Sequence, residues 1–178
     1  MEIINKFFDV ELEPDVLGEN LEILHSDSAR LQMRMITPLL KQFNTAAEPR
    51  DEYPLGLHVW FFDKTGEPSG EASANWAQYD KTEDIWELRG EVELSNVDGR
   101  KLQTEHFFWD RRKEIIYSHV FTQMTDVDSS IVTGISFTGN QDFTNMRFES
   151  GRATIVMIEV EEEIEEEGEK YESTEDKD

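Results

Sequence analysis

The histidines and carboxylates are the residues of this sequence that could do acid–base or metal chemistry. The four histidines are His25, His58, His106 and His119. None of them stands at the spacing of a metal-ligand motif, so ordinary strand histidines are the expectation. A glycosidase-type carboxylate pair could come from Glu67, Glu71, Asp80 and Asp84. These acids lie in or beside solvated polar turn segments, which do not favour a catalytic carboxylate pair.

Nucleophiles and phosphate-binding loops are also missing from the sequence. It contains no cysteine, which excludes a disulfide scaffold, a thiolate zinc site and a cysteine nucleophile. No serine lies in a G-x-S-x-G elbow, and no glycine-rich loop suits a phosphate. The sequence therefore predicts a protein that is not an enzyme and that needs no cofactor and no metal.

Acidic residues dominate the composition. The 178 residues include 40 Asp and Glu against 17 Lys and Arg, a formal net charge of -23. This charge argues against nucleic acid and against an anionic membrane surface as partners, because both are bound through Lys and Arg. Residues 159–178 alone hold 12 acidic and 2 basic residues. Such a segment cannot bury a core, so we expect a solvated, disordered tail; capture of a basic partner is the alternative.

Period-two alternation runs through most of the chain from Tyr53 to Ile158. Trp86, Leu88, Val92 and Leu94 share one parity, for example. Polar segments rich in Gly, Asn and Asp separate the alternating stretches every 12 to 18 residues. Alternation of β-branched and aromatic residues between such turns predicts a meander of long antiparallel strands.

Two segments of the chain resemble each other at an offset of 30 residues. Residues 79–86 (YDKTEDIW) align with residues 109–116 (WDRRKEII), each with an aromatic residue, an Asp-led charged turn and an apolar return strand. We interpret this as stacked hairpin units, although any two hairpins with charged turns would look similar.

The runs Trp60-Phe61-Phe62 and Phe107-Phe108-Trp109 place large apolar groups on both faces of their strands. Either both faces are covered, or one lines a groove for an apolar ligand.

Several of these segments together resemble the LptC family of lipopolysaccharide-export proteins. The similarity lies in residues 70–80 (GEASANWAQYD), 86–94 (WELRGEVEL), 98–105 (DGRKLQTE) and Trp109-Asp110. Residues 131–137 (IVTGISF) resemble the family's I-x-G-x-G strand, with Ser136 in place of the second glycine. The order and spacing of these motifs carry the resemblance, from about Tyr53 to Ile158.

The resemblance implies a single-domain, twisted, open β-jellyroll of two antiparallel sheets. It also implies a periplasmic, non-enzymatic carrier, held at the inner membrane by an anchor or lipoprotein signal expected upstream of residue 1. Such a carrier takes lipopolysaccharide from an inner-membrane ABC transporter and passes it to a periplasmic bridge protein of the same fold. The lipid's acyl chains lie between the sheets.

Two sets of residues follow from this interpretation. Side chains of shared parity on successive strands are expected to line the lipid groove: Trp86, Leu88, Val92, Leu94, Leu102, Thr104, Ile135 and Phe137. The last strand is expected to be the edge that pairs with a partner, because it has high β-propensity and no proline. The edge residues are Ala153, Thr154, Ile155, Val156 and Met157.

The expected domain organisation is an N-terminal arm over 1–20, the jellyroll over 21–158 and the acidic tail over 159–178. Two other functions fit the residues. One is a carbohydrate-binding jellyroll of the cell surface, in which Trp60 and Trp76 stack on sugars. The other is a structural β-module whose edges self-assemble.

Overall fold

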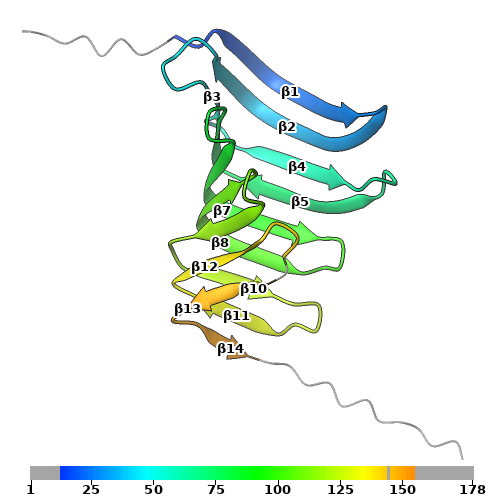
Figure 1. Ribbon diagram of the computed structural model, residues 1–178, viewed down its shortest axis with the longest axis vertical. Coiled ribbons are helices and arrows are strands. Elements are labelled where there is room, and N and C mark those ends of the chain that lie inside the picture. The colour runs from blue at the N-terminus through cyan, green and yellow to red at the C-terminus, as the bar shows by residue number, and fades with distance from the viewer. Residues whose placement is uncertain (1–12, 144, 155–178) are drawn as a thin grey trace, which may run out of the picture.

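The computed structural model describes residues 13–143 and 145–154, and this part of the chain consists of β-strands and turns (Figure 1). Every strand pairing in it is antiparallel. The predicted all-β class is confirmed. In the described residues the strands are β1 (Val16–Asp27), β2 (Arg30–Phe43), β3 (Arg50–Tyr53), β4 (Leu57–Phe62), β5 (Pro68–Ala74), β6 (Trp76–Asp80), β7 (Ile85–Asn96), β8 (Lys101–Asp110), β9 (Ile115–Ser118), β10 (Thr122–Thr125), β11 (Ile131–Gly134), β12 (Ser136–Asn140), β13 (Arg147–Glu149) and β14 (Arg152–Thr154).

The strand pairings divide this single sheet into two layers. Layer one runs in the order β1-β2-β4-β5-β7-β8-β10-β11-β14, and layer two runs in the order β2-β3-β6-β7-β8-β9-β12-β13. The long strands β2, β7 and β8 belong to both layers. On β7, for example, residues 85–89 pair with β6, while residues 93–96 pair with β5. The layers are therefore joined by continuous backbone on one side, as in a folded jellyroll.

The corner is the line along which the chain passes between the layers. On β7 it lies at Gly90 and Glu91, where a bulge shifts the pairing with β8. Both residues have positive φ, 73° for Gly90 and 48° for Glu91. Between other strands the chain crosses through single residues or short loops, including Asn75 and Ile135.

Buried hydroxyl groups satisfy the backbone at the corner. The Thr37 hydroxyl donates to the Gly56 carbonyl at 2.8 Å. The Thr104 hydroxyl donates to the Phe121 carbonyl at 2.9 Å, and the Thr122 hydroxyl lies 3.1 Å from Thr104 Oγ1. Threonine suits these sites because a strand bend leaves carbonyl groups without ladder partners, and an unpaired buried carbonyl is costly.

The mouth is the side opposite the corner, where turns close the hairpins of each layer. Two turns of layer two repeat the same local structure at the 30-residue offset seen in the sequence. Asp84 and Glu114 both have positive φ, 59° and 55°. The Arg111 amide donates to the Asp84 carbonyl, and the Gln141 amide donates to the Glu114 carbonyl, each at 3.1 Å. The turns therefore stack on one another, as the internal resemblance predicts.

The core lies between the layers and forms one apolar cluster. Its most buried members include Met35, Leu102 and Val92 from layer one and Phe107 and Phe137 from layer two, each at most 2% exposed. Inward side chains of both layers meet there because successive strand residues point to opposite faces.

The first described strand begins inside the segment expected to be an N-terminal arm. β1 begins at Val16, so residues 16–20 belong to the sheet and not to an N-terminal arm. The strand reaches back to Val16 because its partner β2 continues to Phe43, and Val16 pairs with Gln42. Residues 1–12 of the expected arm, residues 155–158 and the acidic tail lie outside the described residues.

Candidate functional site

The expected lipid groove corresponds to the space between the two layers. Of the eight side chains expected to line it, six are buried, and five of these belong to the apolar cluster. The buried ones are Leu88, Val92, Leu94, Leu102, Thr104 and Phe137. Trp86 is partly buried and packs against the cluster. The sequence pattern thus located most of the interior surface, while its role in binding lipid stays a prediction.

Ile135 is the exception, and its expected inward position is wrong. Its side chain is 59% exposed, and its amide donates to the Glu149 carbonyl at 3.1 Å. It lies where the chain leaves β11 in layer one and enters β12 in layer two. A residue at such a crossing belongs to neither strand, so the in-and-out alternation of side chains along β11 and β12 does not predict which way its side chain points.

Thr104 occupies the expected buried position, but its hydroxyl group forms hydrogen bonds that stabilise the corner. Its hydroxyl is held by the Phe121 carbonyl and lies 3.3 Å from the Ser118 hydroxyl. With its polar atom fully engaged, Thr104 presents only its methyl group to the interior. Its hydroxyl is therefore not free to bind a lipid.

Phe107 is an interior residue that the alternation missed. Leu102 and Thr104 point inward from the first half of β8, and the same parity would place Phe108 inward. Phe107 is 2% exposed instead, whereas Phe108 is half-buried and stacks on Tyr117 with centroids 5.0 Å apart. The parity changes because β8 bends at the corner between Thr104 and Phe107. The run Phe107-Phe108-Trp109 was the sequence signal, since it offered apolar groups to both faces.

Trp86 lies within a stack of aromatic rings in layer two. Its ring is 5.5 Å from that of Tyr53 and 5.0 Å from that of Tyr79. Burial, and then the nearby charge of Asp51, raise the pKa of the Tyr53 phenol. The Tyr79 hydroxyl donates to Asp84 at 2.8 Å. Both phenols therefore stay neutral and extend the apolar interior toward the mouth.

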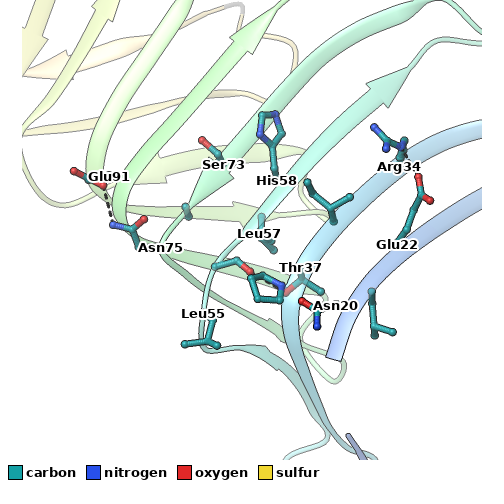
Figure 2. A pocket seen from close by; sticks show the side chains of 15 residues that line it. Asn20, Glu22, Arg34, Thr37, Leu55, Leu57, His58, Ser73, Asn75 and Glu91 are labelled. Atoms are coloured by element: carbon teal, nitrogen blue, oxygen red, sulfur yellow. Dashed lines mark hydrogen bonds and ion pairs between the residues drawn. The ribbon is translucent and has the colours of Figure 1, made fainter. Parts of the chain in front are cut away.

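Two hollows at the molecular surface lie along the corner. One, of about 640 Å³, is lined by residues of β1, β2, β4, β5 and β7 and by Leu55 (Figure 2). Its lining is mixed, and its charged groups are already paired: Glu22 with Arg34, and Glu91 with Asn75. A second, of about 680 Å³, includes the exposed Phe121. Neither is the interior space between the layers, which the core side chains fill.

The histidines and acids do not assemble a reactive centre in the described residues. His58 contacts Glu71 at 3.0 Å, and His106 contacts Glu87 at 2.6 Å, on the outward faces of their strands. Asp80 accepts the amides of Thr82 and Glu83 within its own turn. Within 13–143 and 145–154, no group of three or more potential metal ligands is present.

The two tryptophans considered for sugar stacking are already in contact with cations. Arg34 lies 4.6 Å from the ring centre of Trp60, which also stacks on His58. Arg89 lies 4.7 Å from the ring centre of Trp76. Each arginine occupies ring surface that a sugar would need, so nothing in this geometry favours the carbohydrate-binding alternative.

The expected partner edge lies at one end of layer one. Ala153 and Thr154 belong to β14, which pairs with β11 through Val132 and Ile131. Ile155, Val156 and Met157 lie outside the described residues. At the other end of layer one, β1 pairs with β2 over its full length. Among the described strands, β1 and β14 each have a neighbour on one side alone.

In the part of the chain that the structure describes, no helix is long and apolar enough to cross a membrane.

Comparison with known proteins assigns the family. No curated protein matches the sequence. The family model described as "Lipopolysaccharide-assembly, LptC-related" matches residues 10–155, which span all fourteen described strands. That family is a non-enzymatic, envelope-associated family that acts in lipopolysaccharide transport. The chain therefore belongs to the LptC-related family of lipopolysaccharide-assembly proteins.

Proposed function

We propose that this protein is a periplasmic lipid carrier, held at the inner membrane, that binds the acyl chains of lipopolysaccharide between its two layers. It receives the lipid from an inner-membrane ABC transporter and passes it to a bridge protein of the same fold. The observation that supports this proposal most directly is the continuous apolar interior, which joins both layers from Met35 on β2 to Phe137 on β12. An acyl chain needs such an apolar path.

The charge of the protein suggests how the lipid would be oriented. Lipopolysaccharide is anionic, and the chain carries a net charge of -23. Like charges repel, most strongly where water is excluded. The acyl chains would therefore lie between the layers, and the sugar-phosphate headgroup would remain in solvent at the mouth.

Photo-crosslinking along one strand tests the carrier function. A benzophenone amino acid at Val92 or Leu94, which face the interior, should capture lipopolysaccharide, because the reactive group then lies beside the acyl chains. The same amino acid at Glu93 or Ser95, which are partly exposed and alternate with them on β7, is the matched control. Gel electrophoresis with antibody to the lipid is the readout, after circular dichroism confirms folding. Equal capture at all four positions, or none at any, would contradict the proposal.

Handover through the C-terminal edge predicts a position-dependent effect of proline on β14. Successive residues of an antiparallel strand direct their N–H groups to opposite sides, so Ala153→Pro and Thr154→Pro remove N–H groups on opposite sides. The variant that loses the outward N–H should keep its thermal stability and bind the purified bridge protein at least tenfold more weakly. The variant that loses the N–H facing β11 should lose stability. If both variants bind the bridge protein as tightly as the wild type, β14 is not the docking edge.

A further inference from the structure

Contacts across the mouth connect the rim of layer one to the rim of layer two. Phe61, on β4 of layer one, meets Trp109, near the end of β8 in layer two. Their ring centroids are 6.1 Å apart with an interplanar angle of 89°, the edge-to-face arrangement that aromatic pairs favour. Arg100, in the β7–β8 turn of layer one, donates from Nη1 to the Phe143 carbonyl in layer two at 3.0 Å.

Neighbouring residues hold both contacts in position. The Trp109 indole N–H donates to Gln141 Oε1 at 3.0 Å, which fixes the ring over the mouth. The Arg100 guanidinium also pairs with Asp126, with Nη2 and Oδ2 3.3 Å apart. The Val127 amide, and then Arg100 itself, lower the pKa of Asp126, so this carboxylate remains charged. The ion pair with Asp126 in layer one thus holds the Arg100 side chain in position to donate to the Phe143 carbonyl.

The interior behind these contacts is already filled. Leu102 is 0% exposed, Val92 is 1% exposed and Phe137 is 1% exposed. Protein interiors are packed like organic crystals, so a filled core has no room for an acyl chain unless its walls move apart. The layers cannot part at the corner, because β2, β7 and β8 run through it as continuous strands. Separation has to occur at the mouth.

We propose that the Phe61–Trp109 and Arg100–Phe143 contacts form a latch that holds the mouth closed without lipid and opens to admit acyl chains. This inference rests on the proposed function. The latch consists of a ring contact between partly buried side chains and a hydrogen bond from Arg100, whose side chain is 30% exposed. Both can break while the strand ladders and the corner hydroxyl groups stay intact. The mouth can therefore open without unfolding the domain.

Weakening the latch should accelerate lipid entry. In Arg100→Gln, association of a fluorescent lipid A analogue, measured by stopped flow, should be about tenfold faster, the factor expected for the loss of one charge-assisted hydrogen bond. Arg89→Gln is the matched control, because Arg89 pairs with Glu87 and lies on Trp76, away from the mouth. An unchanged rate in Arg100→Gln, or an equal rise in Arg89→Gln, would overturn the latch.

Locking the latch with a chemical crosslink should prevent lipid entry. The sequence contains no cysteine, so introduced cysteines can be crosslinked without competing thiols. In the double variant Phe61→Cys, Trp109→Cys, a short bismaleimide should abolish lipid uptake. Each single-cysteine variant treated with the same reagent should still bind. Binding by the crosslinked protein at the rate of the single variants would refute the latch and leave the carrier function standing.

A measurement without lipid separates the latch from the proposed function. Exchange of the Trp109 indole proton, followed by NMR, should be faster in Arg100→Gln than in Arg89→Gln, because an open mouth withdraws the Phe61 ring from Trp109 and exposes the indole to water. If the wild type binds no lipid, the carrier function fails, and the exchange rates alone decide whether the contacts hold the mouth closed. Equal exchange in both variants would contradict the latch.

Discussion

Phe107→Ala should lower the free energy of unfolding by about 3–5 kcal/mol, the range for removing a fully buried phenylalanine. Its ring is 2% exposed and lies 6.3 Å from the ring of Phe137 in the interior of layer two. Truncation would leave a cavity that neither layer can fill, because both are fixed at the corner by continuous strands. Urea denaturation with an unchanged m value would measure this loss.

Phe108→Ala is the matched control, since Phe108 is the next residue on the same strand. It lies on the outer face, where it stacks on Tyr117 and contacts the His106 ring at a tilted angle. The loss of a partly exposed aromatic contact should cost about 1–1.5 kcal/mol. If the two variants lose equal stability, or if Phe108→Ala loses more, then β8 does not change parity at the corner and the inward face is assigned incorrectly.

Gly56→Ala should be the most damaging single substitution at the corner, with a loss of about 2–5 kcal/mol. Gly56 has φ of +83°, and a left-handed conformation costs other L-residues about 1–2 kcal/mol. A Cβ at this position would also lie 2.5 Å from the Ala74 carbonyl oxygen, which is backbone and cannot move aside. Relieving such a clash typically costs a further ~1–3 kcal/mol.

Gly66→Ala separates the conformational cost of a positive φ from the cost of the steric clash. Gly66 has φ of +90°, and a Cβ there would meet nothing within 4 Å, because the residue lies in the exposed β4–β5 turn. This variant should lose about 1–2 kcal/mol, the conformational cost alone. Comparable midpoints for the two variants in thermal unfolding would mean that the corner relaxes around an added methyl group. The close approach of the two segments at Gly56 would then not be a rigid part of the fold.

These variants also separate stability from lipid transport. Phe107 and Gly56 lie in the interior and at the corner, so losses there should reduce lipid binding through unfolding. Arg100 lies at the mouth, where substitution should change the rate of lipid entry with little effect on the core. A panel that combines them distinguishes a carrier that fails because it unfolds from one that fails because its mouth is altered.

The fold class and most of the interior residues could be predicted from the sequence. Alternation between polar turns predicts antiparallel strands because side chains of a strand point to opposite faces in turn. That rule is local, so it correctly grouped Val92 with Leu94 on β7 and identified Leu102 on β8. The 30-residue resemblance likewise reflected a local repeat, in which Asp84 and Glu114 occupy equivalent positions in stacked turns. The ordered motifs pointed to the family that the family model then confirmed.

The orientation of side chains where strands change layers could not be predicted from the sequence, because it depends on how the layers fold onto each other. Side chains alternate between the two faces within one strand, and a bend at the corner resets this alternation. For this reason the side chain of Phe107, and not that of Phe108, points into the interior, and the side chain of Ile135 is exposed. On β7 the extra residue of the bulge at Gly90 offsets this reset, so Leu88 and Val92, which have the same parity, both face inward. The contact of Phe61 with Trp109 joins residues far apart in the chain. No local pattern encodes such a pair, because it exists only once the layers fold onto each other.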